Sequence, residues 1–172
     1  MAAVILTGCG GGGSDGKPAE APTAAASASA PADPQAAEKA AVLAAYAGMG
    51  AAEVRTYASG TLDPEVERYA TDQALADVKA TLFWYQQRGT RMRGQPTHTA
   101  AVESLDTTGD PRRAVVSDCV DSTGYDKVDK DGNPAGAAPS GPRRHVVTSG
   151  LQRTGSGPWL VWTSTIERDR TC

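Results

Sequence analysis

The spacing of the apolar residues changes near Gly89, and this change constrains the fold more than any other feature of the chain. Before Gly89, apolar residues recur every three or four positions, as they do on one face of an α-helix. The clearest stretch runs from Ala37 to Tyr57 and contains Val42, Leu43, Tyr46, Met49, Val54 and Tyr57. It predicts an amphipathic helix that ends at Ser59-Gly60.

Two further helices are predicted before Gly89. Asp63, followed by Pro64 and Glu65, is typical of an N-cap with proline at the first helical position, and it predicts a short helix that reaches Tyr69. A third helix is predicted from Thr71 to near Gly89, with an apolar face made of Leu75, Val78, Leu82, Phe83 and Tyr85. The part of the chain between Gln35 and Gly89 is therefore expected to be helical.

After Gly89 the chain consists of short segments rich in valine and threonine, separated by turn residues. These segments predict four strands, joined in sequence order as an antiparallel meander: Thr97 to Asp106, Arg113 to Asp121, Arg144 to Thr154 and Trp159 to Glu167. The Gly/Pro/Ala-rich segment from Ser122 to Arg143 is predicted to be a long, mobile hairpin connection. Together these elements predict an α+β domain whose N-terminal helices pack on a curved antiparallel meander sheet of four or more strands.

The first 34 residues differ in composition from the rest of the chain. After Cys9 come glycines and then an Ala/Ser/Pro/Glu-rich stretch that cannot bury a core, so residues 9–34 are predicted to be a disordered linker. The residues from Val4 to Cys9, Val-Ile-Leu-Thr-Gly-Cys, resemble a bacterial lipobox, whose cysteine thiol accepts a lipid. We expect residues 1–8 to be the truncated remnant of a signal peptide, Cys9 to carry the lipid, and residues 35–172 to form a single domain.

The lipobox resemblance implies a lipoprotein that is anchored on the outer face of the cytoplasmic membrane. No run of the sequence approaches the ~20 apolar residues that a membrane-spanning helix needs, so the lipid on Cys9 is the expected link to the membrane. The alternative is a cytosolic protein in which Leu-Thr-Gly-Cys occurs by chance.

The cysteine count agrees with export. If Cys9 carries a lipid, Cys119 and Cys172 remain as an even pair in an exported chain, which predicts a disulfide between them; two free thiols are the alternative. The net charge of -3 gives no broad attraction for nucleic acid, which is therefore not an expected partner.

A series of short segments runs through the domain: Tyr46-Ala47-Gly48-Met49, Tyr57-Ala58-Ser59-Gly60, Arg68-Tyr69-Ala70-Thr71, Arg93-Gly94-Gln95-Pro96, Ser117-Asp118-Cys119-Val120-Asp121 and the Trp-containing last strand before Cys172. This series resembles a family of small secreted or lipid-anchored actinobacterial proteins without an assigned activity. That family is similar to the SnoaL-like, nuclear transport factor two-like cone, a cystatin-like fold in which a bent sheet wraps around helices and leaves a pocket. The resemblance implies a fold and a location, and no particular activity.

Enzymes of the cone fold, ketosteroid isomerase among them, place carboxylates or a His/Asp pair in the pocket. Here His98 lies on one predicted strand and Asp118 on the next, so a favourable register would place His98 beside Asp118 as a general base and its orienting group. The alternation of residues does not decide which face of the sheet points inward. A solvent-facing His98 and a turn-capping Asp121 are therefore the alternative.

The aromatic residues Trp84, Tyr85 and Trp162 are candidates for lining a ligand pocket, because large rings line pockets as readily as they fill cores. Filling the core is the alternative role. Trp159 and Trp162 are expected on opposite faces of one strand, so at most one of the two faces the helices.

No metal site and no cofactor are expected. The acidic run of Asp126, Asp129 and Asp131 resembles a calcium loop only in part, because Pro134 stands where an EF-hand needs glycine and no glutamate occupies the twelfth position. A polar turn is the better interpretation. The sequence also contains no phosphate loop, zinc-ligand spacing or dinucleotide fingerprint.

Two hypotheses for function follow. The first is a noncatalytic module, tethered to the membrane, that binds a small apolar ligand or a protein partner. The second is a small enzyme of the isomerase, dehydratase or cyclase kind that uses His98 and Asp118.

Overall fold

The computed structural model describes residues 33–137 and 140–172, and residues 33–172 form one compact unit. Cys9, the predicted signal-peptide remnant and nearly all of the predicted linker lie outside the described residues.

Three helices precede the sheet: α1 (Ala36–Ser59), α2 (Val66–Tyr69) and α3 (Asp72–Gln87). They match the three predicted helices. The buried side of α1 follows the expected spacing and includes Val42, Ala45, Met49, Ala52 and Thr56. The helix ends at Gly60, whose left-handed φ of 74° suits glycine because it has no Cβ to clash.

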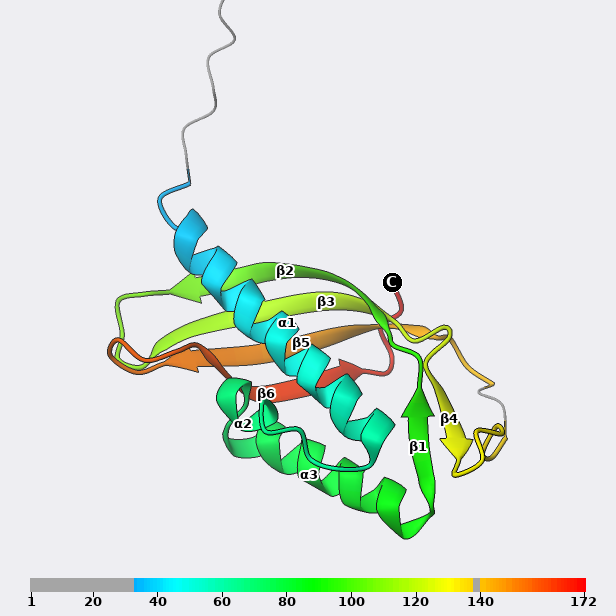
Figure 1. The fold of residues 1–172 in the computed structure, drawn as a ribbon. Helices are drawn as coiled ribbons and strands as arrows, with labels where there is room; N and C mark the ends of the chain where they lie inside the picture. Colours follow the sequence, from blue (N-terminus) through cyan, green and yellow to red (C-terminus); the bar gives the residue numbers. More distant parts are fainter. Residues whose placement is uncertain (1–32, 138–139) are drawn as a thin grey trace, which may run out of the picture. The chain divides into compact units, whose positions relative to one another are not determined.

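Four long strands follow: β2 (Thr97–Asp106), β3 (Arg112–Asp121), β5 (Arg144–Arg153) and β6 (Leu160–Glu167). They form one antiparallel sheet in the order β2-β3-β5-β6, as predicted for the meander. Within the described residues, the prediction of an α+β domain with helices packed against an antiparallel sheet is therefore confirmed. In Figure 1, α1 crosses one face of this sheet, and α3 lies alongside β6.

The segment from Ser122 to Arg143 is a hairpin connection between β3 and β5, as predicted, but it contains a strand that the sequence did not predict. It contains β4 (Asp126–Asp129), which pairs with β1 (Thr90–Arg93) in a small antiparallel sheet, and neither strand was predicted. Each strand is four residues long, too short to show a period of its own, and the pairing joins segments far apart in the chain.

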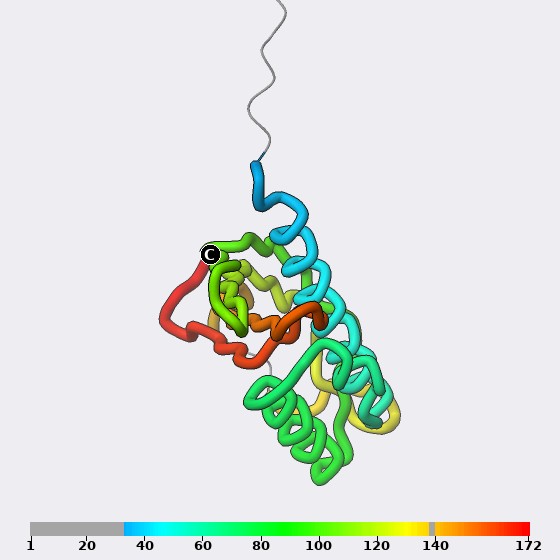
Figure 2. The backbone as a smooth tube through the Cα atoms, turned by 90° about the vertical axis from the view of Figure 1, so that its left-hand side faces the viewer, coloured from blue at the N-terminus to red at the C-terminus, as the bar shows by residue number. Residues whose placement is uncertain are grey.

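The hydrophobic core lies between α1, α3 and the inward face of the sheet. Its fully buried members include Val42, Val66, Val116, Leu151 and Val161. The inward side of β3 alternates as a one-sided strand should, with Ala114, Val116 and Asp118 buried. Figure 2 shows the strands of the sheet bent round rather than lying flat, with α1 along one side.

The disulfide joins Cys119 on β3 to Cys172, with their Cα atoms 5.8 Å apart. It ties the end of the chain to the sheet, as the cysteine count predicts. The segment after β6 is also held by the backbone N–H of Val146, which donates to the carbonyl of Arg170 at 3.0 Å.

Among residues 33–137 and 140–172, no helix combines the length and the apolar character that crossing a membrane would take.

Candidate functional site

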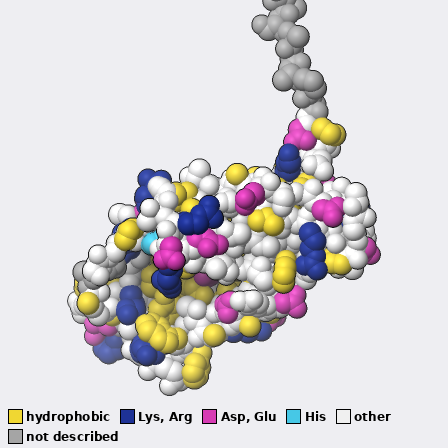
Figure 3. Space-filling view, turned by 180° about the vertical axis from the view of Figure 1, so that it is seen from behind, with side chains coloured by type: hydrophobic (Ala, Val, Ile, Leu, Met, Phe, Trp, Pro, Cys, Tyr) yellow, Lys and Arg dark blue, Asp and Glu magenta, His cyan; other side chains and the backbone are white. Residues whose placement is uncertain are grey.

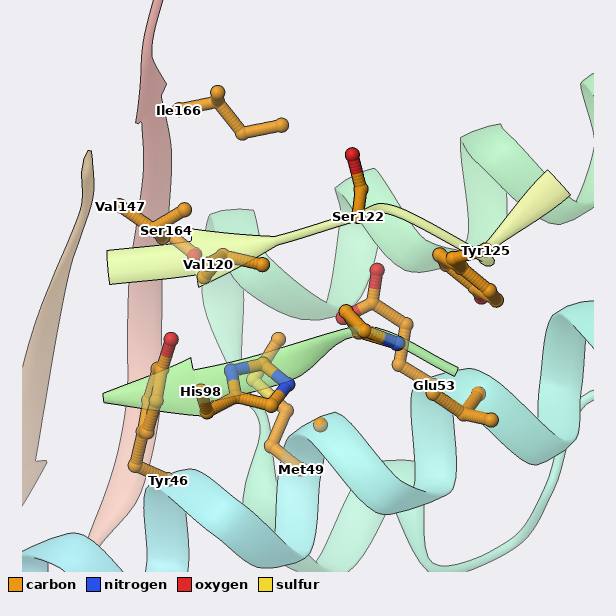
Figure 4. A pocket seen from close by; sticks show the side chains of 13 residues that line it. Tyr46, Met49, Glu53, His98, Val120, Ser122, Tyr125, Val147, Ser164 and Ile166 are labelled. Carbon is orange, nitrogen blue, oxygen red and sulfur yellow. The ribbon is translucent and has the colours of Figure 1, made fainter. Parts of the chain in front are cut away.

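A cavity of about 230 Å³ lies between the second half of α1 and one end of the four-stranded sheet. We call it the inner cavity. Its apolar walls come from Met49, Val54, Pro96, Val120, Val147 and Ile166, and its polar side chains are Tyr46, Glu53, His98, Ser122, Tyr125 and Ser164. Figure 4 shows His98 on β2 and Glu53 on α1 pointing into the same space, with Tyr125 beside Glu53.

A second concavity, the outer groove, has a volume of about 560 Å³ and runs along α1 and the edge strand β2. Tyr46, Gly50, Val54, Pro96 and His98 line both the groove and the inner cavity. The two spaces therefore adjoin at His98, whose side chain is 39% exposed.

Asp118 is the centre of a hydrogen-bond cluster with Tyr46 and His98, two residues that line the inner cavity. It is 1% exposed, and its Oδ2 accepts from the Tyr46 hydroxyl at 2.8 Å and from His98 Nδ1 at 2.6 Å. Its Oδ1 accepts from the backbone N–H of Thr99 at 2.7 Å. These three donors satisfy a carboxylate that is otherwise costly to bury.

The cluster holds His98 in one orientation. The Asp118 carboxylate accepts a hydrogen bond from Nδ1 of His98, so the other ring nitrogen, Nε2, is left for a ligand or solvent. The ring edge also meets Tyr46, with the two centroids 6.3 Å apart and nearly perpendicular. A neutral imidazole held this way can accept a proton or a hydrogen bond at Nε2.

Glu53 is the carboxyl group in the lining of the inner cavity. Among the described residues no lysine or arginine pairs with it, and burial raises the pKa of its carboxyl. The Tyr57 hydroxyl and the nearby His98 lower this pKa, but burial is the largest influence. A carboxyl group in such a place gains by meeting a hydrogen-bond donor or a cation.

Tyrosines surround Glu53. Burial and the charge of Glu53 both raise the pKa values of Tyr57, Tyr85 and Tyr125 above the usual range of a phenol. For Tyr46, burial and the contact with Asp118 raise the pKa in the same direction. These phenols therefore stay protonated, and the buried Tyr125 hydroxyl has no hydrogen-bond partner within the part of the chain that the structure describes.

The face of the molecule opposite to that of Figure 1 carries a hollow in which hydrophobic side chains gather. Figure 3 shows Lys, Arg, Asp and Glu side chains around this hollow. An apolar floor with a polar border is the usual form of a small-molecule site.

The structure brings two of the predicted site residues together and leaves three others apart from both spaces. His98 and Asp118 meet as the favourable register required. The ring is nevertheless 39% exposed, as the alternative of a solvent-facing His98 expected. Asp121 caps a turn, as that alternative also expected, because its Oδ1 accepts from the backbone N–H of Thr123 at 2.8 Å. Trp84, Tyr85 and Trp162 line neither the inner cavity nor the outer groove.

Each of these three rings has another packing role. Trp84 is 38% exposed, and the Arg88 guanidinium lies over its ring, with Cζ 4.1 Å from the ring centroid. Tyr85 packs edge-on against Tyr57 beside the core. Trp162 lies under the guanidinium of Arg113 at 5.0 Å, on the side of the sheet that faces away from the core.

Trp159, which was predicted to begin the last strand, is a core residue. Trp159 is 4% exposed, just before β6, and its Nε1 donates to Glu38 at 3.0 Å. Trp159 and Trp162 thus lie on opposite sides of the sheet, as the strand alternation predicts.

The acidic run around Asp129 forms a turn. Asp129 Oδ1 accepts from the backbone N–H groups of Asp131 and Asn133, both at 2.9 Å. Where the structure describes the chain, no three His, Cys, Asp or Glu side chains form a group that could hold a metal ion.

The cavity residues that were not predicted from the sequence include Tyr46, Glu53 and Tyr125. Glu53 carried a usable signal, because it lies four residues after Met49 and four before Tyr57, within the apolar stripe of the first helix. An acid at such a position faces the protein interior. Tyr125 gave no such signal, since it lies in a segment without periodicity.

Comparisons with known proteins add no family. No family model matches the chain, and no curated protein matches it. A solved structure to which it is similar is the intermembrane space region of the chloroplast protein ARC6, with a TM-score of 0.47 and 11% identity over 78% of this chain and 97% of that one.

Proposed function

We propose that this chain is a lipid-anchored extracytoplasmic protein that binds a small, largely apolar ligand in the inner cavity without transforming it. The observation that carries the proposal is the cavity itself. It has apolar walls with a few convergent polar groups, His98, Glu53 and Tyr125, which is the general composition of small-molecule sites.

The location rests on the leader sequence. The segment that ends in Cys9 matches the lipobox pattern, and the following Gly-rich and Ala/Ser/Pro-rich residues suit a tether. The disulfide between Cys119 and Cys172 supports export, because disulfides persist in oxidising compartments. Mass spectrometry of the protein expressed in a bacterium behind a functional lipoprotein signal peptide tests this part, and an unmodified Cys9 in the membrane-free fraction would contradict it.

The SnoaL-like cone is the finer description of the fold that we propose. Its support is the bent four-stranded sheet with α1 across its inward face and a cavity toward one end of the strands.

Toluene tests ligand binding directly, because it is small enough for a space of about 230 Å³ and carries no charge. We expect toluene to shift the backbone NMR signals of residues around the inner cavity, including Gly50 and Val120. The same titration of Gly50→Phe should show no such shifts. Gly50 lines both spaces and a Cβ there would meet nothing within 4 Å, so the new phenyl ring has room to fill the space that toluene would occupy.

Gly141→Phe is the matched control. Gly141 also has open space around it, lies outside both lining sets and is exposed, so its variant should bind toluene like the original chain. Absence of any localised shift in the unmodified protein would refute the binding proposal.

The bond between His98 Nδ1 and Asp118 favours a second candidate, a small isomerase, dehydratase or cyclase in which His98 is the general base. In that mechanism Nε2 takes a proton from the substrate, and Asp118 stabilises the imidazolium that forms. Deuterium exchange at the α-carbon of phenylacetone, followed by NMR in D2O, tests the required proton abstraction. Exchange that equals the buffer rate, or that survives in His98→Ala, would rule out this role toward carbonyl carbon acids.

A further inference from the structure

The charged groups of the inner cavity are out of balance. Glu53 lines the cavity, and Asp118 is hydrogen-bonded to the lining residues Tyr46 and His98. His98 is the one basic side chain among the described residues of the lining. Asp118 Oδ2 holds His98 through Nδ1 at 2.6 Å. Among the described residues, Glu53 is left without a lysine or arginine partner.

Glu53 is half-buried, and a carboxyl group removed from water without a cationic partner is unfavourable in the empty protein. Glu38, on the same helix, shows the usual solution, because Arg153 at 3.1 Å and the Trp159 indole at 3.0 Å both donate to its carboxylate. In the described part of the chain, Glu53 meets the Tyr57 hydroxyl and the charge of nearby His98 but no arginine and no indole. A partner for Glu53 can instead come with the ligand.

The surroundings of Glu53 suit an ammonium group. Tyr46 and Tyr125 line the same cavity, and Tyr57 contacts the Glu53 carboxyl. Ring faces attract cations, and phenol oxygens accept hydrogen bonds from an N–H donor. The buried Tyr125 hydroxyl, which has no partner in the described part of the chain, is one such oxygen.

We propose that the ligand of the inner cavity is a small apolar amine, whose protonated amino group pairs with Glu53 and whose apolar body packs against Met49, Val120 and Val147. This inference rests on the proposed function, since it names the chemical class of the ligand. The volume of about 230 Å³ suits a single-ring amine such as benzylamine.

Three probes with one common ring separate charge from shape: benzylamine, benzyl alcohol and benzoate carry positive, zero and negative charge at neutral pH. Calorimetric titration of the 172-residue chain should give the tightest binding for benzylamine, weaker binding for benzyl alcohol and none for benzoate. A charge-assisted hydrogen bond corresponds to a preference of at least about tenfold for benzylamine over benzyl alcohol.

Glu53→Gln keeps the shape of the side chain and removes its charge. It should weaken benzylamine binding at least about tenfold and change benzyl alcohol binding by less than about threefold. Glu103→Gln is the matched control, because Glu103 is exposed on β2 and lines neither space, and both affinities should stay unchanged.

The outcomes separate the two proposals. Equal affinity for benzylamine and benzyl alcohol in the unmodified chain, or benzylamine binding that survives in Glu53→Gln, overturns the amine and leaves small-ligand binding standing. Benzoate as the tightest probe also overturns the amine. If none of the probes and no toluene binds to the folded chain, both proposals fail.

Discussion

Two glutamates on helix α1, Glu38 and Glu53, have contrasting environments. Glu38 accepts hydrogen bonds from Trp159, Arg153 and Arg112, and these partners lower the pKa of its carboxyl. Glu53, further along α1, lines a cavity, and burial raises the pKa of its carboxyl. A glutamate therefore joins the helix to the sheet region at one end of α1, whereas at the other end a glutamate lines a cavity and can bind a ligand.

The two ends of the sheet differ in the same way. Near Glu38 the space between α1 and the strands is closed by Leu151, Trp159 and Val161, each no more than 4% exposed. Near Glu53 the strands border the inner cavity, and the disulfide from Cys119 ties this end to the C-terminus. We call these the closed end and the open end. The difference teaches that packing stabilises one end, whereas a covalent link holds the end where packing is incomplete.

Removing the disulfide should have the largest effect. Cys119 and Cys172 are separated by 53 residues, for which the loss of chain entropy on cross-linking predicts about 4 kcal/mol of stability. We expect the double variant Cys119→Ser and Cys172→Ser, made in a Cys9→Ser background, to lose about this amount in urea unfolding. A loss below about 1 kcal/mol would mean that the open end does not depend on the link.

Truncating the closed end should cost slightly less. Leu151 is fully buried, so Leu151→Ala should lower the free energy of unfolding by about 3 kcal/mol. Ile166 lines the open end and is 51% exposed, so Ile166→Ala should cost less than about 1 kcal/mol. Equal losses in chemical denaturation would contradict the distinction between the two ends.

The two glutamates should respond oppositely to pH. The lowered pKa of Glu38 stabilises the fold above its ordinary value of 4.5, and this contribution is lost as the pH falls through the lower folded value. Glu38→Gln should therefore lose about 1 kcal/mol at neutral pH and approach the original chain in acid.

For Glu53 the dependence of stability on pH has the opposite sign. With a raised pKa, the folded protein binds more protons than the unfolded chain, so stability falls as the pH rises above 4.5. Glu53→Gln should be about 1 kcal/mol more stable than the original chain at neutral pH, and the gain should shrink in acid. Parallel pH profiles for the two variants would remove the contrast.

Two glycines of α1 provide the smallest test. A Cβ on Gly50, beside the cavity, would meet nothing within 4 Å, so Gly50→Ala should gain about 0.5–1 kcal/mol from helix propensity. A Cβ on Gly48 would lie 2.6 Å from the Tyr69 ring, and the necessary shift should cancel that gain. Thermal unfolding that shows the same increase for both variants would mean that the helix is loosely packed on both sides.

Local pattern was enough to predict most of the fold. The four long strands are observed within one or two residues of their predicted ends, because valine-rich alternation and turn residues are set by neighbours in the chain. The strands β1 and β4 were not predictable in this way. Each has only four residues, and its stability comes from a partner that is distant in sequence.

The candidate site was predictable only in part. Strand order placed His98 and Asp118 on adjacent strands, but the register that joins them is a property of the whole sheet. Trp84, Tyr85 and Trp162 were plausible pocket residues by size, and their surroundings in the structure give them other contacts.

The sequence by itself determined the helical first part, the strand segments, the cysteine pair and the lipobox-like leader, because these depend on residues that are close in the chain or on a simple count. The tertiary structure alone decided that Glu38 meets Arg153 and Trp159 while Glu53 meets a cavity. From the sequence alone, the two glutamates occupy similar positions on the predicted helix. The environment of Glu38 depends on Arg153 and Trp159, which are 115 and 121 residues away in the chain, and that of Glu53 depends on incomplete packing. Such contacts follow from the folded chain rather than from local periodicity.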